Sequence, residues 1–157
     1  MHTQKGVTYL WMLFLVFLLS LVVGKVLEVY STMVQRQREV ELLYVGDLYR
    51  QAIRQYYLSS PGYLKKYPDK LDDLLKDPRH LSLRRYIRQL YLDPMTGQGF
   101  NLIQSPEGGI MGVASLSDKM PVKQAGFSTV DSTFTGGQHY SDWQFVYRGE
   151  AASVPLR

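Results

Sequence analysis

The sequence contains 157 residues, no cysteine and a formal net charge of +4 at pH 7. This length fits one membrane helix and one soluble domain of about 130 residues. The lack of cysteine excludes a disulfide framework and thiolate chemistry, and the small, dispersed positive charge argues against a nucleic-acid partner.

Residues 7–24 form an apolar run without a charged side chain, and Lys25 ends it. As a helix this run spans about 27 Å, close to the ~30 Å hydrocarbon core of a bilayer. We therefore predict a membrane helix at residues 7–25. The run exceeds the 7–15 apolar residues of a secretory signal, and residues 22–25 lack a small-residue cleavage pattern. A plain single-pass anchor fits the same hydropathy.

The residues around the start of this run resemble a known signal. Lys5-Gly6 is followed by Val-Thr-Tyr-Leu-Trp-Met-Leu, which resembles the class III signal of type IV pilins and type II secretion pseudopilins. The resemblance implies a leader at residues 1–6, cleavage by prepilin peptidase after Gly6, and methylation of Val7 as the new N-terminus. It also places Thr8 at a position where the family has threonine, in the part of the helix that serves assembly.

Trp11 departs from this family pattern, which has glutamate at the fifth mature position. In a filament that glutamate neutralises the buried N-terminal ammonium of a neighbouring subunit. An unpaired partner of a buried charge pair costs about 3–5 kcal/mol. The tip-located minor pseudopilin of the family also lacks the glutamate. Trp11 therefore argues against a bulk filament subunit, or indicates a looser assembly.

The same resemblance implies a location and a set of partners. Lys5, His2 and the amino terminus lie before the apolar run, whereas Lys25 and then Glu28 follow it, so the charge asymmetry slightly favours a cytoplasmic N-terminus. The resemblance implies a single-pass protein of the bacterial inner membrane, with the head at residues 26–157 in the periplasm. The implied partners are other pseudopilins or pilin-like subunits, prepilin peptidase and the inner-membrane assembly platform.

The helical pattern continues beyond the membrane segment. Apolar residues recur every three or four positions as far as Tyr56, no proline occurs before Pro61, and Ser59–Gly62 is a stop signal. We predict one helix from residue 7 to residue 58, amphipathic in its second half. Gly46 is a weak point, costing about 1 kcal/mol relative to alanine. The polar residues expected on the solvent side are Arg36, Gln37, Glu39, Asp47, Arg50 and Arg54.

Two short helices are predicted in the first part of the head. Residues 67–78 indicate a capped helix with Asp69 as N-cap and Pro78 at its end. Leu83–Leu90 forms a second helical patch that carries three arginines. We interpret these arginines as a solvated cationic face, with an acidic partner or a nucleic acid as the alternative.

The pattern then changes to the two-residue period of strands. Strands are predicted at residues 100–103, 110–116 and 143–148, with a turn at residues 105–109. Three strands with one apolar face need a cover, which the amphipathic half of the long helix supplies. The predicted fold is therefore α+β and pilin-like: a long N-terminal helix packed on a small antiparallel sheet.

The head also resembles that of the major type II pseudopilin. The resemblance rests on Tyr67-Pro68, on the leucines at positions 71, 74 and 75, on Asp93-Pro94 and on residues 112–116. The family implies a calcium site in the loop that follows, but calcium needs six to eight oxygen ligands. Here Asp118 is followed by a lysine, and Asp131 and Asp142 would have to meet it in space. We expect no cofactor and keep calcium as the alternative.

The loop at residues 117–141 is about 25 residues long, so we expect it to be a functional surface or mobile. No catalytic pattern accompanies it, because the three histidines (His2, His80 and His139) are far apart in the sequence. His139 and Asp142 lack an identifiable nucleophile. The sequence thus favours a non-enzymatic pseudopilin-like structural subunit. The alternative is a single-pass membrane protein that does not polymerise and whose outer domain binds a partner.

Overall fold

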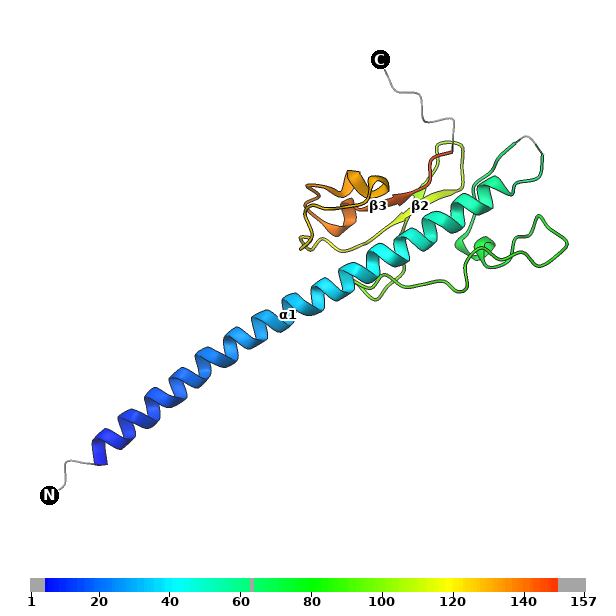
Figure 1. Cartoon of the computed structure of the whole chain (residues 1–157). Helices are drawn as coiled ribbons and strands as arrows, with labels where there is room; N and C mark the ends of the chain where they lie inside the picture. Colours follow the sequence, from blue (N-terminus) through cyan, green and yellow to red (C-terminus); the bar gives the residue numbers. More distant parts are fainter. Residues whose placement is uncertain (1–4, 63, 150–157) are drawn as a thin grey trace, which may run out of the picture. The chain divides into compact units, whose positions relative to one another are not determined.

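The structure is a computed structural model, which describes residues 5–62 and 64–149 (Figure 1). Residues 1–4, which hold His2 and most of the expected leader, lie outside the described residues. The chain divides into two compact units, Met1–Gln37 and Arg38–Arg157. The coarse prediction is confirmed: an apolar N-terminal helix is joined to a head with a three-stranded antiparallel sheet.

Helix α1 (Lys5–Leu58) contributes to both units and matches the predicted helix closely. Its sequence contains no proline, so every residue can continue the backbone ladder. The helix ends where the Ser59 amide bonds to the Gln55 carbonyl and Ser60 to Tyr57, just before Pro61 and Gly62. Gly62 has φ 81°, a left-handed conformation that glycine adopts without steric cost.

The sheet consists of β1 (Asn101–Gln104), β2 (Ile110–Ala114) and β3 (Gln144–Val146), in the order β1-β2-β3. Leu102 pairs with Val113, and Val113 pairs with Phe145 on its other side. A register shift after Ile103 leads into the turn that joins β1 to β2. All three predicted strands are confirmed, and each is slightly shorter than or shifted from its predicted range.

The core of the second unit surrounds the last turns of α1. In Figure 1, β2 and β3 lie on one side of this part of the helix, and the segment with the 3-10 helix η1 (Leu71–Leu74) lies on the other. The apolar residues that the helix buries are three or four positions apart, so they form the single stripe that the sequence predicted. Its buried apolar residues are Leu42, Val45, Tyr49, Ala52, Ile53 and Tyr56.

Gly46 lies where α1 meets β3, and it has a packing role there that the sequence did not predict. A Cβ atom added to Gly46 would lie 2.4 Å from Cγ of the Phe145 ring. The missing side chain lets the aromatic ring of β3 pack directly on the helix backbone. Close packing here offsets the helix-propensity cost of glycine.

The two predicted helices in the first part of the head need correction. Residues 67–78 contain only the 3-10 helix η1, and Lys70, not Asp69, holds the N-cap position. The backbone amide of Lys70 donates to the Asp73 carboxylate at 3.0 Å. Leu83–Leu90 contains no helix, because the amides of Tyr86 and Ile87 donate to the Leu74 carbonyl at 2.9 and 3.3 Å.

The segment at residues 117–141 is more ordered than the sequence predicted. It contains the 3-10 helix η2 (Thr129–Phe134), and η3 (Tyr140–Asp142) begins near its end. Phe134 stacks on Trp143 with an interplanar angle of 9° and a centroid distance of 5.5 Å. Phe127 and Tyr140 contact the same indole edge-on. These aromatic contacts tie the long connection to the core.

Candidate assembly surface and the contacts that shape the head

The apolar part of α1 presents an uninterrupted exposed surface. Gly6–Val23 is long and apolar enough to cross a membrane, and none of it is buried within the structure. The only polar side chains in this stretch belong to Thr8, Tyr9, Trp11 and Ser20. The Ser20 hydroxyl donates to the Val16 carbonyl at 2.9 Å, so the helix itself satisfies it.

All four predicted site residues lie in the first two turns of α1. Gly6, Val7, Thr8 and Trp11 are exposed, and the Trp11 ring contacts Phe14 edge-on at 6.2 Å between centroids. Val7 and Trp11 are four residues apart and therefore share one face of the helix. The Gly6–Val7 bond lies in the first turn, where backbone amides have no intrahelical partner. No charged side chain lies within residues 7–24 to pair with an ammonium group.

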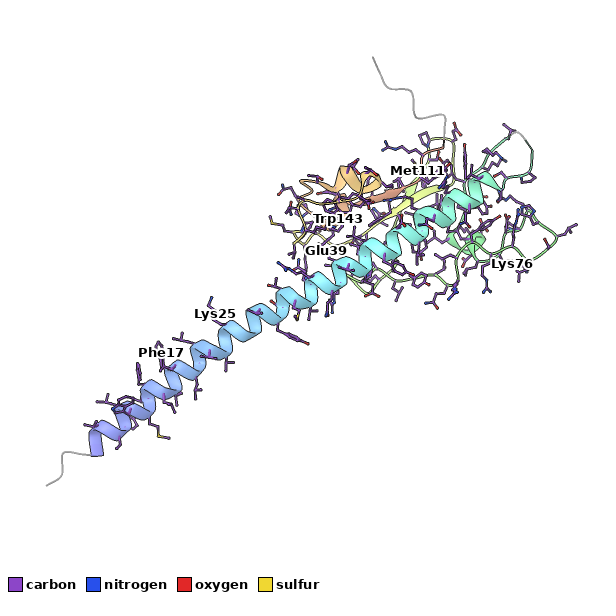
Figure 2. All side chains as sticks on the ribbon, viewed as in Figure 1. Phe17, Lys25, Glu39, Lys76, Met111 and Trp143 are labelled. Carbon is purple, nitrogen blue, oxygen red and sulfur yellow. The ribbon has the colours of Figure 1, made fainter. Side chains whose placement is uncertain are left out.

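Glu39 is the first charged residue buried by the head, although the sequence placed it on the solvent side. Its carboxylate accepts hydrogen bonds from the amides of Val122 (2.9 Å) and Lys123 (3.0 Å). The Tyr140 hydroxyl donates to the same carboxylate at 2.8 Å. Figure 2 labels Glu39 near Trp143 in the second unit. Three donors explain why this carboxylate is tolerated at 4% exposure.

Arg50 is likewise buried and not solvent-exposed. It donates to Asp47 at 3.3 Å and to Asp131 at 2.6 Å. Its guanidinium carbon lies 5.5 Å from the centre of the Phe145 ring. Arg50 therefore links α1 to η2 and covers the aromatic residue that packs on Gly46. The sequence held a signal for this burial. Glu39, Gly46 and Arg50 are each three or four residues from a buried apolar residue of α1, so they lie on or beside the same face of the helix.

A third polar cluster centres on Asp77, which is fully buried. Arg79 donates to its two carboxylate oxygens at 2.8 Å, and Tyr86 donates to one of them at 2.8 Å. Arg79 also donates to the Ser60 hydroxyl at 2.6 Å and stacks 3.5 Å above the Tyr56 ring. This cluster attaches residues 77–86 to the end of α1.

Burial by itself would raise the pKa of Asp77, but hydrogen bonds from Arg79 and Tyr86 outweigh it and hold that pKa well below its usual range. The hydrogen bond to Asp77 in turn raises the pKa of Arg79. Burial raises the pKa of Tyr56 to about 12, against the opposing effect of the Arg79 cation. At neutral pH the cluster therefore contains an ionised Asp77–Arg79 pair beside a neutral tyrosine.

Asp93 forms the fourth buried polar site, at the Asp93-Pro94 turn that the sequence singled out. Its carboxylate accepts from the Met95 amide (2.9 Å) and the Ser115 hydroxyl (2.7 Å). It therefore joins the turn before β1 to the residue that follows β2. Sequence reasoning identified the turn but not its hydrogen bond to Ser115.

The three aspartates considered for calcium have separate partners. Asp131 pairs with Arg50, and Asp142 accepts from the backbone amides of Gln138 and His139 at 2.9 Å. The Ser141 hydroxyl lies 3.5 Å from Asp118. Within residues 5–62 and 64–149, no group of three or more metal-binding side chains is positioned to hold an ion. The three aspartates that the calcium alternative would need to bring together are therefore engaged with different partners.

The His139 ring and the Asp142 carboxylate have different hydrogen-bond partners. The Nδ1 atom of the ring lies 2.6 Å from the carbonyl oxygen of Asp118, whereas the Asp142 carboxylate binds the His139 backbone. These two residues thus shape a turn between η2 and β3.

Comparisons with protein-family models, curated proteins and solved structures give no match, so the functional assignment rests on the residues and contacts described above.

Proposed function

We propose that the chain is a pseudopilin-like structural subunit of a type II secretion or type IV pilus-like machine, and that it assembles through its N-terminal helix. One observation carries this proposal. Every residue of 7–23 is exposed, while the buried apolar cluster of the head begins only at Leu42. The head therefore has a core of its own, and the apolar helix surface is available for contacts outside the chain.

Such a surface must be covered by lipid or by other helices. Residues 7–23 bury their apolar side chains in the bilayer before assembly, as their length permits. In a filament, packing against the equivalent helices of neighbouring subunits replaces the lipid contacts. The finer assignments follow from this proposal: a pilin-like fold, the bacterial inner membrane, a cytoplasmic N-terminus and a periplasmic head.

Trp11 bears on the type of subunit. An indole cannot neutralise the ammonium group that cleavage after Gly6 would create on a neighbouring chain. An unpaired buried charge costs about 3–5 kcal/mol, so we favour a minor subunit over the bulk component of the filament. Prepilin peptidase, related subunits and the inner-membrane assembly platform are the partners that this function requires.

Processing provides the first test. The chain is expressed together with a prepilin peptidase, and the mature N-terminus is determined by mass spectrometry. We expect N-methylated Val7, and we expect Gly6→Ala to block cleavage. Gly99→Ala is the matched control, because a Cβ atom there meets nothing within 4 Å. An intact N-terminus in the presence of active peptidase would contradict the assignment.

Crosslinking provides the second test, and the lack of native cysteine makes it clean. A Trp11→Cys variant should form disulfide-linked dimers in cells that contain the complete machine. The same variant carrying Gly6→Ala should form few, because an unprocessed subunit stays in the membrane. If both form equal amounts, or neither forms any, the protein is the non-polymerising single-pass alternative.

A further inference from the structure

A groove lies between the last turns of α1 and the outer edge of β3. It has a volume of about 770 Å³, and an adjoining hollow of about 290 Å³ extends it along the strand. The two share Arg50, Val130, Val146 and Arg148. The α1 wall of the larger groove is formed by Asp47, Arg50, Gln51, Arg54, Gln55 and Leu58.

The β3 wall offers free backbone hydrogen-bonding groups. Strand β3 is at the end of the sheet, and its neighbour on one side is β2. The Tyr147 amide donates to the Met111 carbonyl at 2.9 Å, so these two residues form a hydrogen-bonded pair between β3 and β2. Hydrogen-bonded and non-hydrogen-bonded pairs alternate in an antiparallel ladder, so the backbone amide and carbonyl of Phe145 also face β2. The amides and carbonyls of Gln144 and Val146 then face away from β2. Among the described residues, no backbone hydrogen bond outside the sheet ladder uses them.

The larger groove is lined by three arginines and by Asp47, and the adjoining hollow adds Asp142. Arg50 is committed to Asp47 and Asp131, but Arg54 and Arg148 form no ion pair with any residue in the described ranges. Arg54 is on the helix wall and Arg148 on the strand wall, so a carboxylate between them would be contacted from both sides. Val130 and Val146 add apolar surface between these cations.

We propose that this groove binds an extended, acidic segment of a partner protein, which adds to β3 as a fourth strand. The backbone of the segment would bond to Gln144 and Val146, its carboxylates would pair with Arg54 and Arg148, and an apolar side chain would cover Val130. Main-chain bonds at a free edge supply affinity, and alternate side chains supply specificity. This binding role does not depend on the filament function proposed above.

A labelled peptide tests the proposal with the full chain in detergent micelles. The probe is a short peptide that alternates valine and glutamate, and fluorescence anisotropy measures its binding. The double variant Arg54→Glu/Arg148→Glu should weaken binding about tenfold or more, since it reverses both free cations. Arg84→Glu/Arg85→Glu is the matched control, because it reverses two exposed arginines outside the groove and should leave the affinity within about twofold.

Two further peptides and hydrogen exchange test the strand geometry. The first is a peptide that alternates valine and lysine, and it should not bind. The second is the valine–glutamate peptide with N-methylated backbone amides, which should lose binding because it cannot donate hydrogen bonds to the edge of β3. The bound peptide should slow exchange of the Gln144 and Val146 amides. The thermal midpoints of both double variants are measured, so that a loss of folding is not mistaken for a loss of binding.

Several results would overturn the proposal. These are equal binding of the lysine peptide, equal weakening by the Arg84 and Arg85 changes, and no protection at Gln144 and Val146. Displacement of the peptide by free glutamate at a similar concentration would reduce the groove to a site for small anions. Binding that appears only after removal of residues 150–157 would show that the chain's own end is the occupant.

Discussion

Glu39 stabilises the head through hydrogen bonds to a buried charge. Replacing it with glutamine keeps the shape but removes the charge that three donors face. We expect Glu39→Gln to lower the free energy of unfolding by about 2–3 kcal/mol, the loss typical of hydrogen bonds to a charged group. Denaturant unfolding in micelles, followed by Trp143 fluorescence in a Trp11→Phe background, measures it.

Glu41 provides the control, because it is exposed on the same helix two residues away. Glu41→Gln should change the free energy by less than about 0.5 kcal/mol, as surface substitutions usually do. Equal effects of the two substitutions would mean that the Glu39 contacts contribute nothing specific.

Gly46 is required by packing and not by backbone conformation. In Gly46→Ala the new methyl group would meet the Phe145 ring at 2.4 Å, so either the ring or the helix must shift. Overpacking costs about 1–3 kcal/mol, and the gain in helix propensity returns at most about 1 kcal/mol. We therefore expect net destabilisation, seen as a lower thermal midpoint. A stabilised Gly46→Ala protein would contradict this contact.

Asp77 should make stability depend on pH in the acid range. Its pKa is lowered by folding, so the unfolded chain binds more protons below about pH 4. The stabilisation is complete above that pH and is lost as pH falls toward the folded-state pKa. Asp77→Asn should cost about 3 kcal/mol at pH 7, and its difference from the wild type should shrink on acidification.

Unfolding measured at several pH values between 7 and 2 tests this expectation. Asp72→Asn is the control, because Asp72 is exposed on η1. If the Asp77→Asn difference stays constant from pH 7 to pH 2, the ionised pair with Arg79 is not the source of the stability.

At the scale of elements, Leu83–Leu90 is held by single hydrogen bonds and not by a helix. We expect hydrogen exchange to be slow for the Tyr86 and Ile87 amides, which donate to the Leu74 carbonyl. Arg85 and Arg88 are exposed and should exchange quickly. Mass spectrometry with electron-transfer fragmentation resolves these amides. Uniform protection from 84 to 90 would mean that a helix forms after all.

Sequence reasoning predicted the elements that are defined by periodicity. Helix α1 and the three strands follow from apolar spacing and from the stop at Ser59–Gly62. It failed where tertiary contacts replace local ones, as in Leu83–Leu90, where two amides bond to Leu74. Glu39 and Arg50 were placed on the solvent side because a charge was taken as a sign of exposure. Apart from Asp47, which is three positions from Arg50, their donors and acceptors come from residues 81 to 101 positions away, which spacing alone does not reveal.

The candidate assembly surface could be predicted from the sequence, but the groove beside β3 could not. The apolar composition of residues 7–23 predicts this surface, and the structure adds that none of it is buried. The groove beside β3 was not predictable, because it depends on which strand ends the sheet. Strand order is a property of the folded chain and has no local signal in residues 143–148.

At the scale of the whole molecule, the exposed helix predicts how the protein behaves in a membrane. We expect the chain to stay in the membrane pellet after alkaline carbonate and high salt, and to be released by detergent. The reason is that an anchor at residues 7–23 would bury apolar surface in lipid, and neither treatment weakens that contact. Replacing Leu15 and Leu19 with lysine should release the protein into the soluble fraction. Retention of that variant would contradict anchoring by this segment.

The Glu39 contacts also have a consequence for synthesis. Glu39 leaves the ribosome more than 80 residues before Val122 and about 100 before Tyr140, the residues that bind its carboxylate. At translation rates of about 5–20 residues per second, the start of the head waits roughly 4–20 seconds for these donors. We expect the nascent chain to carry a formed helix with an unclosed head until the last strand emerges, which makes this interval the natural point for a chaperone to act.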